Sequence, residues 1–253
     1  MKDRESYQKP DFSFAHREEG FDNHIENSIR GYSNLHHDVI KLSEYFVEDL
    51  TDVVDIGCST GKTIYEMMKQ NNRFAPLAHY SGIEYAEGFV DDMNARHKQI
   101  DSEGLGDVDF HNMDVRNASF ANCSLITSLF TLQFMPPRSR RDLVKKIYHG
   151  LNTGGAFIFA EKTMARDARL QEIMTFQFYD HKSKNFEADD LLSKERELRS
   201  MMKCSTWNEL HSLCMTAGFC ATKIQPFWQN HLFVGAIVPG IVLVFFYLAY
   251  VLI

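Results

Sequence analysis

The sequence has few cysteines, and they follow no metal-binding pattern. The chain has 253 residues and only five cysteines, which are Cys58, Cys123, Cys204, Cys214 and Cys220. An odd number without any Cys-x-x-Cys pair argues against a disulfide framework and against a zinc site. We therefore expect a protein of a reducing compartment that holds no metal.

The N-terminus lacks an apolar run, and the chain lacks an excess of positive charge. Its first ten residues, MKDRESYQKP, show no feature of a signal peptide, so a cytoplasmic location is expected. The formal net charge of −7 argues against direct binding to nucleic acid and favours a small-molecule substrate. With 44% hydrophobic and 24% charged residues, the composition is that of a folded domain rather than a disordered chain.

Strand-like and helix-like segments alternate along most of the chain. Short apolar runs predict strands at 53–56, 79–84, 108–113, 125–130, 156–160, 220–225 and 231–238. Apolar residues at helical spacing predict helices at 21–30, 35–46, 60–69, 86–97, 138–151 and 207–217, with a turn at 152–155. The alternation predicts an α/β fold with a seven-stranded, mostly parallel sheet, helices on both faces, and a ligand at the carboxyl ends of the strands.

Two segments depart from this alternation. Glu161–Arg199 is highly charged and helical in composition, which predicts a helical insertion over the ligand site, at about 162–205, after the fifth strand. We expect residues 1–238 to form one domain and residues 239–253 to form an apolar C-terminal extension.

The C-terminal run from Leu232 to Ile253 contains no charged residue. Pro239-Gly240 is a natural break, and a helix over the remaining residues would span only about 22 Å, less than the roughly 30 Å of a bilayer core. A short membrane anchor, a helix docked on a partner and a rearranged C-terminus are all open. We hypothesise a weak membrane contact through this run.

A glycine turn between the first predicted strand and the next helix is the first candidate for chemistry. It reads Asp55-Ile56-Gly57-Cys58-Ser59-Thr60-Gly61-Lys62-Thr63. Glycines allow close backbone approach to a ligand, and a helix N-terminus offers free N–H groups. Only three residues separate Gly57 from Gly61, one fewer than a Walker A loop requires. A triphosphate cradle is therefore disfavoured, and an ordinary tight turn is the other alternative, with Cys58 serving as a small residue rather than a nucleophile.

Acidic residues end the next two predicted strands. Glu84 is placed to accept hydrogen bonds from both hydroxyls of a ribose, although it is also placed to cap the following helix. Asp114 is placed to accept from an adenine amino group, with the Val115 N–H facing a ring nitrogen. Because carboxyl ends of parallel strands meet at one edge, the three elements together predict a nucleoside site on a Rossmann-like fold. His36 and His37 lack a ligand at metal spacing and are predicted to lie on the surface.

The chain also resembles the carboxy-S-adenosyl-L-methionine synthase family, over about Phe12 to Val238. The segments that carry the resemblance are Gly31-Tyr32-Ser33-Asn34, Asp55-Ile56-Gly57-Cys58-Ser59, Phe130-Thr131-Leu132-Gln133-Phe134, Ile147 to Gly155, and Glu161-Lys162. The resemblance implies a Rossmann-like class I methyltransferase fold, and a homodimeric enzyme that needs no metal or catalytic cysteine. It implies that prephenate loses carbon dioxide as its ring aromatises, that the methyl group of S-adenosylmethionine captures it, and that the product serves wobble-uridine modification in tRNA.

The resemblance implies further site residues. Arg196 matches the arginine that grips the new carboxylate, a role that suits a planar guanidinium, although Lys194 to Arg199 also suits a solvated helix face. Tyr32 matches the family's entrance tyrosine. The chain departs from the family at Tyr85 and Leu129, both expected to lie beside the cofactor. A conventional methyltransferase acting on a small molecule is the alternative function, and a non-catalytic nucleoside-binding module tethered to a membrane is the third.

Overall fold

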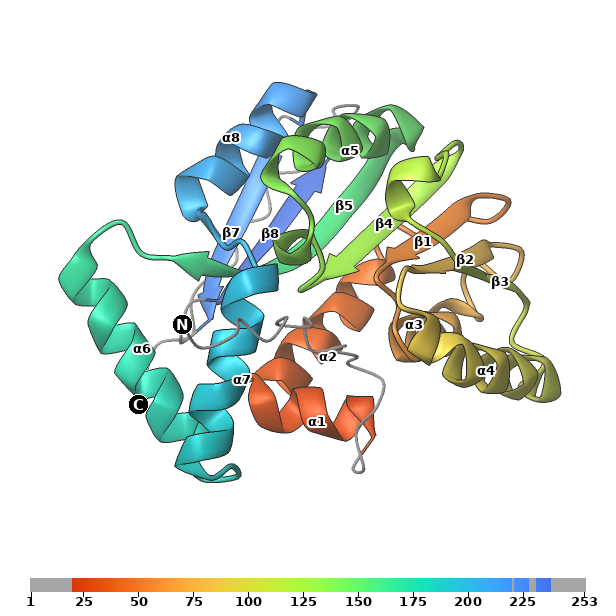
Figure 1. The fold of residues 1–253 in the computed structure, drawn as a ribbon. Coiled ribbons are helices and arrows are strands. Elements are labelled where there is room, and N and C mark those ends of the chain that lie inside the picture. Colours follow the sequence, from red (N-terminus) through yellow and green to blue (C-terminus); the bar gives the residue numbers. More distant parts are fainter. Residues whose placement is uncertain (1–19, 220, 228–230, 238–253) are drawn as a thin grey trace, which may run out of the picture.

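A central β-sheet organises the chain (Figure 1), and the computed structural model describes residues 20–219, 221–227 and 231–237. The strands run in the order β3-β2-β1-β4-β5-β8-β7, and a short strand, β6, pairs with β5 off this path. Neighbouring strands from β3 to β5 are parallel, whereas β8 is antiparallel to both β5 and β7. The strands are β1 (Asp52–Ile56), β2 (His79–Glu84), β3 (Asp107–Asn112), β4 (Cys123–Leu129), β5 (Leu151–Met164), β6 (Ser205–Thr206), β7 (Ala221–Phe227) and β8 (His231–Ile237).

Helices cover both faces of the sheet, as predicted. On one face α2, α3 and α4 pack on β1, β4 and β5, and on the other α5 and α8 pack on the same strands. The α-helices are α1 (Phe21–Ser28), α2 (Tyr32–Ser43), α3 (Lys62–Asn71), α4 (Val90–Glu103), α5 (Pro137–Gly150), α6 (Ala168–Lys182), α7 (Ala188–Met201) and α8 (Trp207–Ala217). Three single turns of 3₁₀ helix are η1 (Glu87–Phe89), η2 (Val115–Asn117) and η3 (Leu132–Phe134).

Strand β5 shows why the sheet is buried on both sides. Phe157 and Phe159 face the α5/α8 layer, whereas Ala156, Ile158 and Ala160 face the α2–α4 layer. All five side chains are buried, so the strand reads as a continuous apolar run rather than an alternating one. Full burial of a phenylalanine stabilises the fold by about 2–3 kcal/mol, which fixes this strand at the centre of the core.

The predicted turn at 152–155 is wrong. Strand β5 already begins at Leu151, which pairs with Cys123, and a register shift in β4 brings Leu125 opposite Ala156. The residues between are accommodated by this irregularity, with Gly154 at a φ of +88°. The two glycines therefore lie in an irregular stretch of strand β5 rather than in a turn that precedes it.

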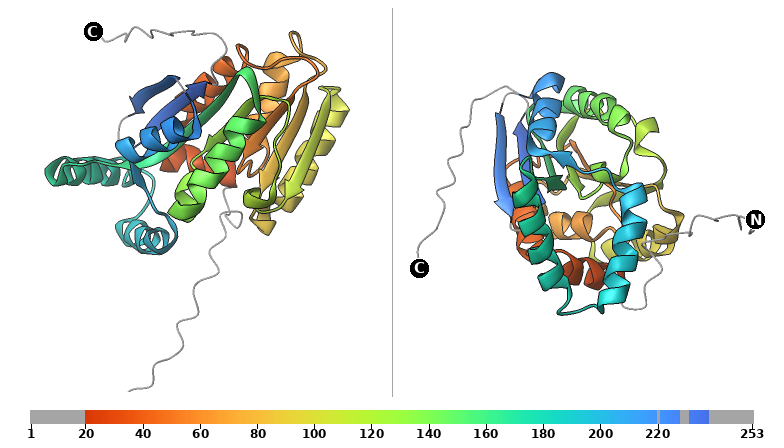
Figure 2. Two further views of the ribbon diagram at one scale, coloured as in Figure 1. Left: turned by 90° about the horizontal axis from the view of Figure 1, so that it is seen from above. Right: turned by 60° about the vertical axis from the view of Figure 1, so that its left-hand side comes forward.

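Helices α6 and α7 lie between β5 and β6 and project away from the sheet (Figure 2). Helix α7 runs beside α1, and the contact of the Lys194 ammonium with His24 joins the two. The strand before them extends to Met164, so the helical segment begins at Ala168, later than the predicted position near 162.

Within the described ranges, none of the helices has the length and apolarity that crossing a membrane requires. The apolar extension predicted at 239–253 lies outside the described residues.

Candidate functional site

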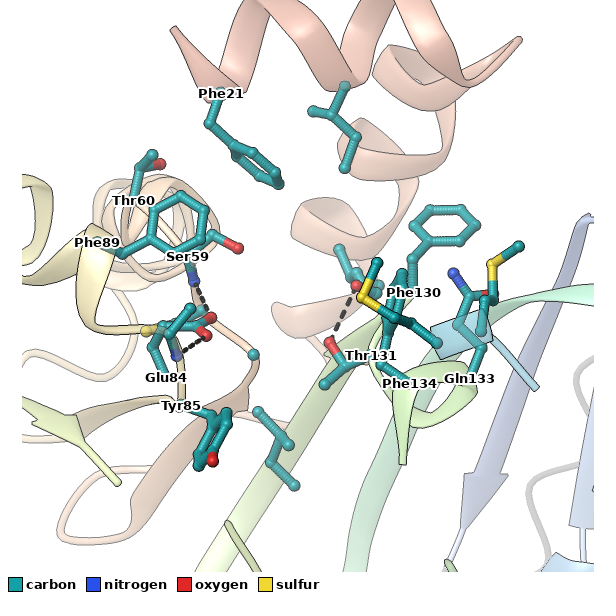
Figure 3. Close-up of a pocket in the computed structure, with 18 of the residues that line it drawn as sticks. Phe21, Ser59, Thr60, Glu84, Tyr85, Phe89, Phe130, Thr131, Gln133 and Phe134 are labelled. Carbon is teal, nitrogen blue, oxygen red and sulfur yellow. Dashed lines mark hydrogen bonds between the residues drawn. The ribbon is translucent and has the colours of Figure 1, made fainter. Parts of the chain in front are cut away.

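A cavity of about 910 Å³ lies at the carboxyl ends of the parallel strands, where an open α/β sheet is expected to bind its ligand. Figure 3 shows Ser59, Glu84 and Tyr85 on one side of it, and Phe130, Thr131 and Gln133 on the other. We call the first side the glycine-turn half and define it by Asp55, Gly57, Ser59, Glu84 and Asp114. The second side, the helix half, is defined by the lining residues Lys162, Phe178, Lys182, Lys194 and Glu195.

The glycine turn after β1 is shaped by close packing at Gly57. This residue has a φ of +77°, and its N–H donates to the carbonyl of Ile83 at 2.7 Å. A Cβ at this position would lie 2.1 Å from the hydroxyl oxygen of Thr131. Only glycine satisfies both the positive φ and this approach, so the turn brings the ends of β1 and β4 together.

Glu84 lies at the end of β2 and faces the glycine turn (Figure 3). Its carboxylate accepts from the backbone N–H of Ser59 at 3.0 Å and from that of Ala86 at 2.8 Å. Burial raises the pKa of this carboxyl, while the two N–H groups oppose the rise. Since a carboxylate has about four acceptor positions, Glu84 holds its own loop and keeps capacity for a ligand.

Asp55 is the most deeply buried carboxylate of the glycine-turn half, with 2% of its surface exposed. It accepts a hydrogen bond of 2.6 Å from the hydroxyl of Thr127 on β4. Burial raises the pKa of Asp55 to about 7, with the Thr127 hydrogen bond opposing and the charge of Glu84 adding to the rise. The site therefore holds a carboxyl group that titrates near neutral pH.

Asp114 and Val115 follow β3 and line the same half of the cavity. The Asp114 carboxylate accepts from the backbone N–H of Arg116 at 2.9 Å and from its guanidinium at 2.5–3.0 Å. The Arg116 hydrogen bonds hold the pKa of this carboxyl below its usual range. Asp114 is thus an ionised acceptor at the cavity edge, beside the buried side chain of Val115.

Three other predicted residues also line the cavity. Tyr32 is buried, its ring stacks on His36 with centroids 5.8 Å apart, and burial raises the pKa of its phenol. Leu129 is half-buried at the end of β4, and Tyr85 is exposed at the rim. The cavity wall is therefore apolar at Tyr32 and Leu129 and open to solvent at Tyr85.

Cys58 and His36 both serve packing. The Cys58 thiol is buried 3.7 Å from the sulfur of Met93, and burial raises its pKa well above the ordinary value, which disfavours the nucleophilic thiolate form. The prediction that His36 lies on the surface is wrong. Its ring is buried between α2 and α3 and lies 3.3 Å from the Thr63 hydroxyl, and burial lowers its pKa to about 4.

Arg196 does not reach the cavity of its own chain. It lies on the exposed side of α7 and is absent from the cavity lining, whereas Lys194, Glu195 and Leu198 line it. Residues two apart on a helix point to different faces, which accounts for the difference between Lys194 and Arg196. Of the segment from Lys194 to Arg199, Arg196 and Arg199 are exposed, as a solvated helix face requires, whereas Glu195 is buried.

Most of the helix half consists of residues that were not predicted from the sequence. The Phe178 ring has the ammonium of Lys162 at 4.4 Å and that of Lys182 at 4.5 Å from its centroid. Lys182 lies 3.8 Å from the carboxylate of Glu195, and both side chains are buried. Lys162 belongs to the Glu161-Lys162 segment that carries the family resemblance, but no spacing in the sequence connects it to α6 and α7.

A buried carboxylate supports the wall between the two halves. Glu161 is 2% exposed and accepts from the backbone N–H groups of Leu132 and Gln133, both at 2.8 Å. Burial raises the pKa of Glu161 to about 8, while the N–H groups and Arg140 oppose the rise. The Gln133 side chain in turn accepts from the N–H of Lys162 at 2.9 Å, so Glu161 positions both sides of the wall.

Helix α1 is attached over the glycine-turn half by polar contacts and by ring packing. The hydroxyl of Thr60 donates to Asp22 at 2.8 Å, and Lys62 pairs with Glu26 at 2.7 Å. The ring of Phe21 packs edge-on against Phe89 with centroids 4.9 Å apart. Because Lys62 is engaged with α1, the turn does not present the lysine that a phosphate cradle uses.

No cluster of three or more potential metal ligands occurs among the residues that the structure describes.

Comparison of the sequence with known proteins gives one consistent family. A model described as a methyltransferase domain matches residues 53–155. The carboxy-S-adenosyl-L-methionine synthase of Staphylococcus epidermidis is 32% identical over 223 residues, which cover 86% of this chain and 91% of that protein. The enzyme of the same name from Actinobacillus succinogenes is 31% identical, over 85% of this chain and 88% of its own.

Comparison with solved structures confirms the Rossmann-like methyltransferase fold. Magnesium protoporphyrin IX methyltransferase from Synechocystis, solved with bound S-adenosylmethionine, matches with a TM-score of 0.55 at 11% identity over 82% of this chain and 80% of its own. The YcgJ protein of Bacillus subtilis matches with a TM-score of 0.56 at 14% identity, over 83% of this chain and all of its own. These identities are low, so the likeness concerns the fold alone.

Proposed function

The chain belongs to the carboxy-S-adenosyl-L-methionine synthase family, and we propose that it transfers a carboxyl group derived from prephenate to the methyl group of S-adenosylmethionine. The observation that carries the proposal is one cavity whose two halves differ in charge. Carboxylates line the glycine-turn half, and three lysines line the helix half. A cationic nucleoside and an anionic co-substrate therefore each have a complementary wall.

The glycine-turn half holds the nucleoside in this proposal. Glu84 accepts from the ribose hydroxyls, and Asp114 with the Val115 N–H contacts the adenine. Gly57, Cys58 and Ser59 let the backbone approach the ligand. The buried carboxylate of Asp55 faces the positive charges of the nucleoside ligand. Tyr85 and Leu129 flank the ligand. Hydrogen bonds to a charged carboxylate contribute about 1.5–3 kcal/mol each, which makes Glu84 and Asp114 the main polar anchors.

The reaction moves one carboxyl group and one proton. As the substrate ring aromatises it releases carbon dioxide and hydroxide, the hydroxide takes a proton from the sulfonium methyl to form water, and a new carbon–carbon bond forms between that methyl carbon and carbon dioxide. The chain's part is to hold the two reactants together and to exclude water. Tyr32, Phe130 and Leu198 are apolar walls suited to that task, and the raised pKa of Tyr32 keeps its phenol protonated.

By the same resemblance we propose a cytoplasmic homodimer whose product serves wobble-uridine modification in tRNA. Arg196 has no place in the cavity wall of its own chain, so the proposal assigns it no role there.

Mass spectrometry of the small molecule released from purified, denatured protein tests the reaction. We expect a species heavier than S-adenosylmethionine by the mass of carbon dioxide, and we expect its formation from S-adenosylmethionine and prephenate in vitro. If only S-adenosylmethionine or S-adenosylhomocysteine is found, and prephenate is not consumed, the proposal fails in favour of a conventional methyltransferase. If the protein binds none of these nucleosides, both the carboxyl-transfer reaction and a conventional methyltransferase reaction are excluded.

Binding of S-adenosylmethionine is expected to strengthen as pH rises through about 7. The pKa of Asp55 is raised to about 7 in the empty cavity, so below that pH the carboxyl is protonated. A positively charged ligand beside it favours the ionised form, and binding at low pH therefore requires release of a proton. The affinity for S-adenosylmethionine therefore rises with pH until Asp55 is ionised before the ligand binds, and it does not change above that pH.

Calorimetry in buffers of different ionisation enthalpy counts the released protons. We expect close to one proton at about pH 6 and none at about pH 8, and we expect Asp55→Asn to abolish the release while keeping an acceptor for Thr127. A dissociation constant that stays the same across this range would contradict the assignment.

A further inference from the structure

The connectors that lead into strands β1 and β2 expose large apolar side chains, at the edge of the sheet opposite to the cavity. Leu50 precedes β1 and is 74% exposed, and Phe74 and Leu77 precede β2 and are 51% and 62% exposed. The backbone N–H of Leu50 donates to the carbonyl of Leu77 at 3.2 Å, which joins the two connectors. We call Leu50, Phe74 and Leu77 the amino-edge patch.

Leu50 has a backbone conformation that is unusual for its residue type. Its φ is +61°, in the left-handed region that a bulky L-residue rarely adopts. Both of its backbone polar groups are fixed, since its N–H is bonded to Leu77 and its carbonyl accepts from the side chain of Asn122 at 2.8 Å. Strain of this kind is typical of functional positions. Because Leu50 is exposed and contributes little to the core, its conformation favours a role at the surface.

Charged groups border the patch. Asp49 accepts from the backbone N–H of Leu77 at 2.8 Å, and the guanidinium of Arg73 lies 4.3 Å from the centroid of the Phe74 ring. Glu48, next to Asp49 in the sequence, is exposed as well. An apolar centre with a polar rim is typical of a surface that packs against protein. The acids at this rim disfavour an anionic lipid surface, which attracts basic segments.

Strand β8 leads an apolar segment of this chain to the same edge of the sheet. It is antiparallel to β5, and its last residue, Ile237, pairs with Ala156, which pairs in turn with Leu125 near the beginning of β4. In Figure 1 the β8 arrow therefore points to the edge at which β1 and β4 begin. Residues 241–253 follow in the sequence, and every one of them is apolar.

The patch lies within short reach of the end of β8. Strands β5 and β4 separate β8 from β1, and three steps of about 4.8 Å make roughly 14 Å. About five residues of extended chain cover that distance. A short connection gives a segment a high effective concentration at a nearby surface, which favours its own chain over a second copy.

We propose that residues 241–253 pack on the amino-edge patch of their own chain. The segment and the patch then remove each other's apolar surface from water. The patch residues do not line the cavity, so this inference is independent of the proposed function. A second copy of the chain and a lipid surface, the contact hypothesised from the sequence, are the competing occupants.

Hydrogen exchange of the intact chain, read by mass spectrometry, is the first test. We expect the amides of 241–253 to exchange at least about tenfold more slowly than in a free peptide of that sequence. Leu77→Asp places a charge in the patch and is expected to remove this protection. Leu170→Asp is the matched control, because Leu170 is 49% exposed on α6, away from the patch. Unchanged affinity for S-adenosylmethionine in both variants shows that they are folded.

Photo-cross-linking separates the three occupants and needs no charged substitution. From Leu77→p-benzoylphenylalanine we expect a cross-link to a peptide of 241–253, in a species that has the mass of one chain on a denaturing gel. Leu170→p-benzoylphenylalanine is expected to give no cross-link to that peptide.

Three results would overturn the proposal. The first is free exchange of 241–253 in the wild-type protein. The second is a cross-link to 241–253 that appears only at the mass of two chains, which assigns the patch to a second copy. The third is protection that appears only with vesicles of phosphatidylcholine and phosphatidylglycerol, which assigns the segment to a lipid surface.

Discussion

Replacing Gly57 by alanine is expected to lower the free energy of unfolding by about 3 kcal/mol and to remove measurable binding of S-adenosylmethionine. A φ of +77° costs a non-glycine residue about 1 kcal/mol. The new Cβ would lie 2.1 Å from the Thr131 hydroxyl and 2.6 Å from its methyl group, and overpacking of this kind costs about 1–3 kcal/mol. Because Gly57 and Thr131 both line the cavity, the strain falls on the site itself.

Gly104→Ala is the matched control for this variant. Gly104 has a φ of +63°, but a Cβ there meets no atom within 4 Å, so only the conformational cost of about 1 kcal/mol applies. Urea unfolding measures the two losses, and calorimetry measures the ligand. Equal losses in the two variants, or normal binding by Gly57→Ala, would contradict the role given to the contact with Thr131.

The elements of the sheet were predictable because their sequence signal is strong. Buried parallel strands read as unbroken apolar runs, and the predicted strand at 79–84 has the bounds of β2. The acids at strand ends were predictable for the same reason, since parallel strands bring Asp55, Glu84 and Asp114 to one edge. The geometry of each acid was not predictable, because the Arg116 contact with Asp114 and the burial of Asp55 depend on side-chain packing.

The helix half of the cavity could not be predicted from the sequence, because several of the residues that line it are charged. Helical periodicity reveals a buried face only when that face is apolar, and on α7 the inward side includes Lys194 and Glu195. Arg196, matched by a loose resemblance, differs from them only by its angle around the helix. His36 was misplaced for the converse reason, since a polar side chain lies between two packed helices.

Replacing Glu161 by alanine is expected to lower the free energy of unfolding by about 3–5 kcal/mol, the largest loss among the substitutions considered. The change leaves the N–H groups of Leu132 and Gln133 buried without acceptors, at about 1–3 kcal/mol each. Urea unfolding at neutral pH measures the loss.

Glu209→Ala separates the effect of burial from the loss of a hydrogen bond. Glu209 also accepts from a backbone N–H, that of Thr206 at 2.6 Å, but it is exposed at the start of α8. In the Glu209→Ala variant, water can accept the hydrogen bond from the Thr206 N–H. The free energy of unfolding is therefore expected to fall by only about 1 kcal/mol. Because Glu161 positions Gln133, which in turn holds the N–H of Lys162, Glu161→Ala is also expected to raise the KM for prephenate and Glu209→Ala is not. Equal losses of stability in the two variants would mean that the Leu132–Gln133 wall is held by its apolar packing, and Glu161 would lose its assignment as a positioning residue.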